Sequence, residues 1–187
     1  DIQKYEISGF LRGQFGTEDQ IYSHGAGESF VMLDGAIQRS AIDQALINVP
    51  RVARAFTVGR PNDDYSEFSF TATGASLVPW APVNITANRA TDLVLGWTRR
   101  ARITNGWNNL NDVPIGETTE QYRVDLLTGP LYPSGTIIAS YFTNVPSITI
   151  TNAQIVAAYG SGGATIYVAV RQMSSVVGAG KPLEGTF

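Results

Sequence analysis

The chain has 187 residues, of which 16% are charged and none is cysteine. Because 13 Lys and Arg residues stand against 16 Asp and Glu residues, the formal net charge is -3, and no broad positive field is available to hold a nucleic acid backbone. The lack of cysteine excludes disulfide frameworks and thiolate metal sites, and no apolar run approaches the roughly 20 residues of a membrane-spanning helix. We therefore expect neither a nucleic acid partner nor a membrane span.

Gly, Ser, Thr, Asn and β-branched residues are abundant in the chain. This balance is typical of strands joined by tight turns and not of long helices, so the predicted fold class is all-β. The length allows one large β-domain or two small ones, and we expect two.

The first strand-like segment covers residues 4–11, where apolar and polar side chains alternate with a period of two. A second strand is predicted at residues 28–33, followed by Asp34-Gly35, a dipeptide that supplies the positive φ angles of a hairpin turn. Since the chain opens at Asp1, almost directly on the first strand, we expect a piece of a longer polypeptide rather than a processed chain.

Residues 38–48 carry apolar side chains at spacings of three and four, which fit a short helix or a loop before Pro50. Strands are predicted again at residues 51–58 and 67–73, on either side of a polar turn. We therefore expect residues 1–78 to form a small β-rich domain.

Two prolines, Pro79 and Pro82, follow this region. Each fixes its own φ angle and lacks a backbone donor, so residues 79–82 are predicted to be an extended linker between domains. Six strand-like runs separated by turn residues then lie within residues 83–187, at 83–87, 93–99, 120–127, 136–142, 147–151 and 165–172. This order predicts a small antiparallel β-sandwich.

The second of these runs alternates clearly between its two faces. Leu93, Leu95 and Trp97 fall on one face, and Val94 and Gly96 fall on the other. Because an indole contributes a large apolar area, we expect Trp97 to pack in the core of the sandwich.

Several segments of the second region resemble a fibronectin type III domain. They are Pro79-Trp80-Ala81-Pro82-Val83, Leu93-Val94-Leu95-Gly96-Trp97, Glu120-Gln121-Tyr122-Arg123-Val124-Asp125 and Ile166-Tyr167-Val168-Ala169-Val170, with Gly178 and Gly180 later. The resemblance implies a fibronectin type III-like sandwich. In that family a tyrosine on the sixth strand usually packs inward, whereas the apolar frame here turns Tyr167 outward.

A second resemblance is more specific. The segments Trp97-Thr98-Arg99-Arg100-Ala101-Arg102, Gly106-Trp107, Asp112-Val113-Pro114-Ile115-Gly116-Glu117 and Glu120-Gln121-Tyr122 resemble the C-terminal region of large tail-tip proteins of tailed bacteriophages and gene transfer agents. Upstream, Gly9-Phe10-Leu11-Arg12-Gly13-Gln14-Phe15-Gly16-Thr17-Glu18 and Ala26-Gly27-Glu28-Ser29-Phe30-Val31 resemble the domain that precedes the sandwich in those proteins.

This second resemblance implies a structural role and not an enzymatic one. Such proteins are baseplate hub or central tip subunits at the distal end of the tail, within an extracellular virion. The resemblance implies a homotrimer that contacts other tail proteins and contributes to attachment to a host-surface glycan or protein. It leaves open whether the particle is a true phage or a gene transfer agent.

The residues that most often carry catalysis give no supporting pattern. His24 is the single histidine, in a glycine-rich turn, and Asp63-Asp64 and the pair Glu117 and Glu120 have the sequence context of turns. Two glycine-rich segments, residues 160–163 and 178–181, lack the spacing of a phosphate-binding loop and are expected to be loops of the sandwich. We expect no catalytic residue, no cofactor and no metal site.

The arginine cluster Arg99, Arg100 and Arg102 has two interpretations. It is a basic patch for an anionic ligand, or it forms ion pairs with Asp112, Glu117 or Glu120. Clustered arginines near carboxylates more often form ion pairs, so we favour pairing.

The candidate recognition residues lie in one long polar loop, residues 104–112. They are Asn105, Trp107, Asn108, Asn109 and Asn111. A Trp beside Asn residues suits stacking on a sugar ring and hydrogen bonding to its hydroxyls, and loops at the ends of sandwiches commonly carry recognition. The competing interpretation is that Trp107 folds back onto the sandwich. A carbohydrate-binding accessory module of a secreted bacterial enzyme is the alternative function.

Overall fold

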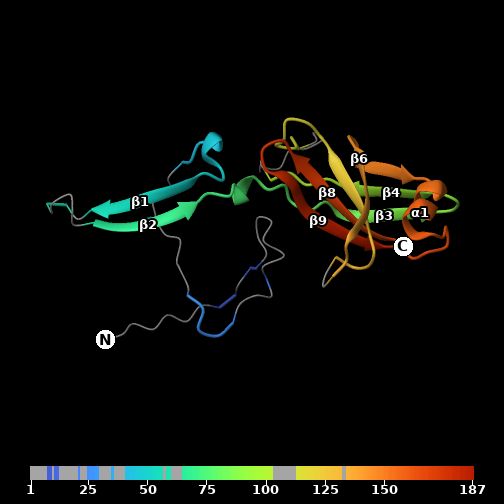
Figure 1. Ribbon diagram of the computed structural model, residues 1–187, viewed down its shortest axis with the longest axis horizontal. Coiled ribbons are helices and arrows are strands. Elements are labelled where there is room, and N and C mark those ends of the chain that lie inside the picture. The colour runs from blue at the N-terminus through green and yellow to red at the C-terminus, as the bar shows by residue number, and fades with distance from the viewer. Residues whose placement is uncertain are drawn as a thin grey trace.

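The computed structural model contains three antiparallel sheets and describes residues 8–9, 11–12, 21, 25–29, 35, 41–56, 58–59, 65–102, 113–131 and 134–187. A two-stranded hairpin projects from a larger, two-layered β-sandwich, as Figure 1 shows. The described part of the chain has one α-helix and two 3-10 turns beside nine strands. The expected all-β fold class is confirmed.

The hairpin consists of β1 (Pro50–Phe56) and β2 (Tyr65–Thr71), paired along their whole length. It confirms the strands expected at 51–58 and 67–73. Shortly before it, the described residues 41–49 contain the 3-10 turn η3 (Gln44–Leu46), in which the Asp43 side chain accepts a hydrogen bond from the backbone N–H of Ala45. The strands expected at residues 4–11 and 28–33 fall mostly outside the described residues.

Between the hairpin and the sandwich, a second 3-10 turn, η4 (Ala75–Leu77), precedes the proline-containing residues 79–82. The Pro79 carbonyl accepts a hydrogen bond from the backbone N–H of Lys181 at 3.0 Å. The residues that we expected to be a linker are thus hydrogen-bonded to the sandwich. The division into domains at 79–82 stays a prediction.

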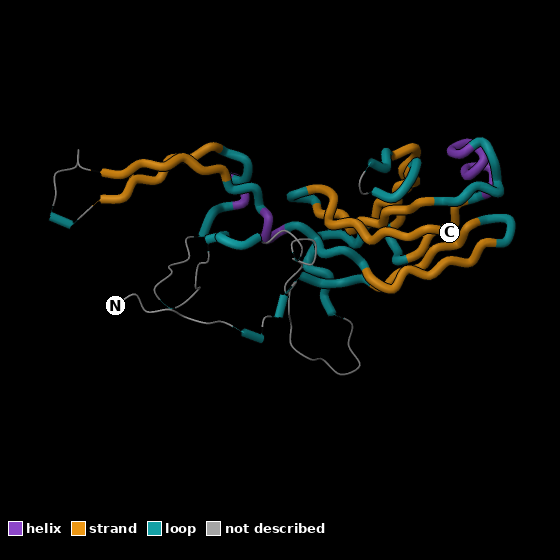
Figure 2. Tube along the Cα trace, turned by 90° about the horizontal axis from the view of Figure 1, so that it is seen from below, coloured by secondary structure: helices purple, strands orange, loops and turns teal. Residues whose placement is uncertain are grey.

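The sandwich has one sheet of three strands and one of four, coloured orange in Figure 2. The smaller sheet has the order β3-β4-β7, with β3 (Val83–Arg89), β4 (Leu93–Thr98) and β7 (Ser147–Ile150). The larger has the order β6-β5-β8-β9, with β5 (Tyr122–Leu127), β6 (Ile137–Thr143), β8 (Tyr167–Ser174) and β9 (Gly178–Thr186). All neighbouring strands are antiparallel. This arrangement is a fibronectin type III-like sandwich.

The core lies between the two sheets. Its buried residues are Leu93, Leu95, Trp97, Tyr122, Val124, Leu126, Ile150, Ile155, Ile166, Val168 and Val170. The alternation along β4 therefore places Trp97 in the core as expected, at 6% exposure. On β8, Val168 and Val170 point inward and Tyr167 is only half-buried, which confirms the frame expected from the sequence.

Two elements differ from the sequence expectations. Residues 178–181 were expected to be a loop, and this expectation was wrong because they begin β9. The helix α1 (Asn152–Tyr159) was not expected, although its N-terminus carries a capping box in which Thr151 and Gln154 exchange hydrogen bonds. The other glycine-rich segment, residues 160–163, is a loop as expected.

Glycine is required at position 180 of β9 because the backbone of neighbouring residues lies close to it. A Cβ atom at Gly180 would lie 2.7 Å from the Pro79 carbonyl oxygen and 2.8 Å from that of Gln172, and both of these atoms belong to the backbone. We therefore expect Gly180→Ala to lower the free energy of unfolding by about 1–3 kcal/mol, the usual effect of forcing an extra methyl group into a packed site. Chemical denaturation monitored by tryptophan fluorescence measures this change.

The matched control is Gly163→Ala. At that position a Cβ atom would meet only the Ser161 hydroxyl, at an ordinary 3.8 Å. The control should stay within about 0.5 kcal/mol of the wild type, as exposed substitutions usually do. Equal stability of the two variants would show that β9 and Pro79 are not in close contact.

Candidate functional site

The candidate recognition loop connects β4 to β5. Its central part, residues 103–112, lies outside the described residues, so Asn105, Trp107, Asn108, Asn109 and Asn111 lie there too. The structure does describe both ends of the loop, at residues 99–102 and 113–121.

Two arginine–glutamate pairs join these two ends, and we call Arg99, Arg102, Glu117 and Glu120 the arginine clasp. Arg102 Nε lies 3.0 Å from Glu117 Oε1, and Arg99 Nη1 lies 3.5 Å from Glu120 Oε2. The same arginines donate to backbone carbonyls, from Arg102 to Gly116 at 3.1 Å and from Arg99 to Val113 at 3.0 Å. Pairing of these arginines with carboxylates is confirmed, whereas Asp112 lies outside the described residues.

The inner pair of the clasp is shielded from solvent. The Glu117 side chain is 4% exposed and the Arg102 side chain 19%. Separation of the two side chains would leave a buried charge without a partner, which is energetically costly. The pair therefore stays closed more firmly than a solvated one. The clasp therefore fixes the base of the loop against the sandwich.

Arg100 differs from the other two arginines of the cluster. Its guanidinium carbon lies 4.9 Å from the centre of the Trp80 ring, the geometry of a cation–π contact. This contact joins the end of β4 to the proline-containing residues 79–82.

Below the clasp, Tyr122 connects the loop base to the core. Its hydroxyl donates to Glu120 Oε1 at 2.8 Å, and its ring meets that of Trp97 edge to face, with centroids 5.2 Å apart. The Trp97 indole N–H and Gln172 Oε1 are buried without a hydrogen-bond partner among the described residues. Burial and the neighbouring Glu120 carboxylate raise the pKa of Tyr122 above its ordinary value.

This raised pKa predicts a loss of stability at high pH. Above about pH 10 the unfolded chain releases the Tyr122 proton while the folded protein still retains it, so unfolding becomes more favourable as pH rises. We expect the free energy of unfolding to fall less steeply above pH 10 in Tyr122→Phe than in the wild type. Urea denaturation from pH 8 to pH 11 tests this, and parallel curves would contradict it.

A small hollow lies next to the loop base. It has a volume of about 220 Å³ and is lined by Thr119, Gln121, Met173, Ser174 and Ser175. Nearby, the Thr118 and Ser175 hydroxyls are 3.4 Å apart. A second, larger hollow of about 580 Å³ lies beside the hairpin and is lined by residues 71–77 with Ile42, Gln44 and Ile47. The first hollow is the more polar in its side chains.

The outward face of the larger sheet carries a charged group that the sequence interpretation did not single out. Asp125 is fully buried, and its carboxylate accepts from Ser140 Oγ at 2.7 Å and from Arg171 Nη1 at 2.5 Å. Arg123 Nε lies 3.1 Å from the same carboxylate. The alternation of side chains along β5 was the sequence signal for this group. Because Val124 faces the core, its neighbours Arg123 and Asp125 lie together on the outward face.

The remaining sequence candidates for catalysis are one histidine and one pair of aspartates. His24, Asp63 and Asp64 lie outside the described residues. Within the ranges that the structure describes, no three His, Cys, Asp or Glu side chains are grouped so that they could hold a metal ion. In those ranges there is also no helix of the length and apolar character needed to cross a membrane.

Comparison with known proteins gave matches among solved structures alone. No family model matches the chain, and no curated protein matches it. Domains d3-d4 of the rat CD45 extracellular region align over 100% of this chain and 84% of that chain, with 10% identity and a TM-score of 0.41. A fibronectin type III domain of the human KIAA0970 protein aligns over 60% of this chain and 74% of that chain, with 17% identity and a TM-score of 0.39. Both likenesses are distant. The fold is identified by the strand order of the sandwich alone.

Proposed function

We propose that this chain is a structural component of the tail tip of a phage or phage-like particle, a baseplate hub or central tip subunit that contributes to host attachment. The observation that supports this most is the arginine clasp. Two of the sequence segments that resemble tail-tip proteins, residues 97–102 and 112–117, include the described ends of one loop, and Arg102 pairs with Glu117 across it at 3.0 Å. The resemblance thus falls on residues that act together.

In this proposal the sandwich is a rigid support and the clasped loop is the contacting element. The core holds β4 and β5, the clasp fixes the loop base, and Trp107 with its neighbouring Asn residues meets the host surface. Three copies around the tail axis would add their weak contacts, because each further contact forms at a high effective concentration. The proposal includes no catalytic step and no cofactor.

The neighbouring genes test the tail assignment. We expect the parent gene to lie among genes for tail-tube and tape-measure proteins. A parent gene that encodes a hydrolase and lies among genes of polysaccharide degradation would favour the alternative, a carbohydrate-binding accessory module. The feature that supports this alternative is the polar loop, in which a tryptophan stands beside asparagines.

Attachment is tested separately with the variant Trp107→Ala. We expect it to weaken the binding of the purified chain to host cells while leaving its thermal unfolding unchanged. Phe56→Ala is the matched control, since Phe56 is an aromatic residue of the hairpin with 52% exposure. Equal binding by both variants would show that Trp107 does not contact the host surface. A loss of stability in Trp107→Ala would show that Trp107 packs against the sandwich instead.

A further inference from the structure

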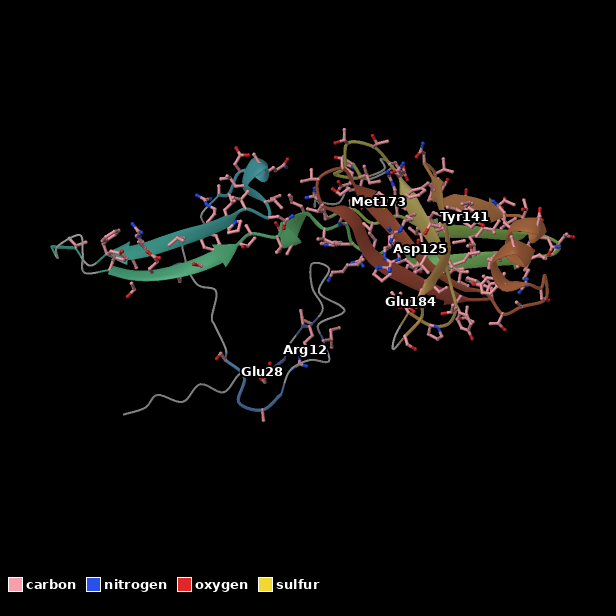
Figure 3. All side chains as sticks on the ribbon, in the orientation of Figure 1. Arg12, Glu28, Asp125, Tyr141, Met173 and Glu184 are labelled. Carbon is pink, nitrogen blue, oxygen red and sulfur yellow. The ribbon has the colours of Figure 1, made fainter. Side chains whose placement is uncertain are left out.

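The outward face of the larger sheet has an unbalanced pair of arginines. Arg123 on β5 and Arg171 on β8 are directly opposite each other in the strand register. Like charges in this position repel, and Asp125 is the single carboxylate to which both are paired. Asp125, which Figure 3 labels, therefore sets one negative charge against the two positive charges that contact it.

The two guanidinium groups are held in place and partly desolvated. Their side chains are 26% exposed for Arg123 and 12% for Arg171. Each guanidinium has five N–H donors, and in the described structure each gives one hydrogen bond, to the Asp125 carboxylate. Glu184 is the next carboxylate on this face, but it accepts from the Leu131 backbone N–H at 3.0 Å and forms no ion pair with either arginine among the described residues.

The small hollow lies along the same two strands as this pair. Two residues that line the hollow lie on the same face of the sheet as the arginines. Gln121 is two residues along the chain from Arg123, and Met173 is two residues from Arg171. Both guanidinium groups donate to Asp125, which lies four residues along the chain from Gln121, and four residues of a strand span about 13 Å. A short chain of sugar rings, and not a single ring, therefore reaches from the hollow to the guanidinium groups.

The hollow offers hydroxyl and amide groups together with one apolar surface. Thr119, Ser175 and Gln121 supply donors and acceptors, and Met173 supplies the apolar surface. At about 220 Å³ it is smaller than the roughly 300–1,000 Å³ of sites for drug-sized ligands. Its size and chemistry suit a single hydroxylated ring.

We propose that this face binds an acidic oligosaccharide, with the carboxylate of one ring on Arg123 and Arg171 and the hydroxyls of another ring in the hollow. Together with Asp125, the added carboxylate balances the two arginine charges. It also accepts hydrogen bonds from the guanidinium donors that Asp125 leaves unused. The proposal uses none of residues 103–112, and it stands on its own geometry whether or not the chain belongs to a tail.

The test uses the whole chain and two matched probes, trigalacturonate and a neutral galactose trisaccharide. Titration calorimetry should detect trigalacturonate and not the neutral sugar. Arg123→Gln and Arg171→Gln should each weaken the binding of trigalacturonate by about 10- to 100-fold, the range of a lost hydrogen bond to a charged group. Arg54→Gln is the control for net charge, because Arg54 lies on the hairpin and its side chain is 54% exposed.

A readout on the wild-type protein keeps the test valid if a variant fails to fold. In nuclear magnetic resonance spectra, the side-chain Nε signals of Arg123 and Arg171 should shift on titration with trigalacturonate, and that of Arg54 should not. Equal binding of the neutral sugar, unchanged binding by both arginine variants, or equal shifts with sodium sulfate alone would each overturn the proposal. The tail assignment is unaffected by these results, since it is tested by gene neighbourhood and by localisation.

Discussion

Replacement of Asp125 by alanine is expected to lower the free energy of unfolding by about 3–5 kcal/mol, the usual cost of breaking a buried ion pair on one side. Asp125 is fully buried and is the carboxylate shared by Arg123 and Arg171. Without it, two partly desolvated arginines face each other across β5 and β8. We expect the lower half of the range, because Arg123 keeps 26% of its side chain exposed to screening solvent.

Two further variants separate charge from packing in this measurement. Asp125→Asn retains the size and most of the hydrogen-bonding capacity of the side chain but not its charge, so it should cost nearly as much as alanine. Ser140→Ala removes one hydrogen bond to the carboxylate and should cost about 1 kcal/mol. Urea denaturation measures all three, and a loss below about 1 kcal/mol for Asp125→Ala would contradict the electrostatic explanation.

The second large effect is expected in the core. Trp97→Ala should lower the free energy of unfolding by about 3–5 kcal/mol, the range found when a buried Trp is truncated to alanine. The side chain is 6% exposed and its ring packs edge to face against Tyr122. The resulting cavity would lie where β4 meets the larger sheet.

Comparison with Trp97→Phe tests a finer point. The indole N–H of Trp97 is buried without a hydrogen-bond partner in the described structure, and phenylalanine removes that unsatisfied donor while it keeps much of the apolar area. We therefore expect the phenylalanine variant to lose well under half of the stability that the alanine variant loses. A similar loss in both variants would show that the indole N–H is satisfied in solution.

The strands and the core were largely predictable because β-strands alternate with a period of two. On β4 this alternation identified the buried face directly, through Leu93, Leu95 and Trp97. On β8 it identified Val168 and Val170 as inward and Tyr167 as outward. In fibronectin type III domains, by contrast, a tyrosine on the corresponding strand usually packs inward. Alternation works where one face of a strand is buried and the other is solvated.

The missed elements have sequences that conceal this signal. β9 contains Gly178, Gly180 and Pro182, residues that are depleted in strands, and Gly180 is there because two backbone carbonyls lie too close for a side chain. α1 has only eight residues, which is about two turns and too short for a helical period to be recognised beside a predicted strand. Its capping box was a local signal that the strand prediction at 147–151 obscured.

The candidate site was predictable only in part. Proximity in sequence was enough to suggest the pairing of Arg99 and Arg102 with carboxylates, and the structure confirms it for Glu117 and Glu120. The group around Asp125 joins residues from three strands, whose side-by-side order is a property of the whole sheet. No local pattern specifies that order, so the arginine pair emerged only from the structure.

Localisation of the chain in intact particles tests the tail-tip proposal most directly. Electron microscopy of purified particles with gold-labelled antibodies against residues 83–187 is the measurement. We expect the label at the distal end of the tail and nowhere along its shaft. Label along the tail-tube wall, or no label on particles at all, would contradict the proposal.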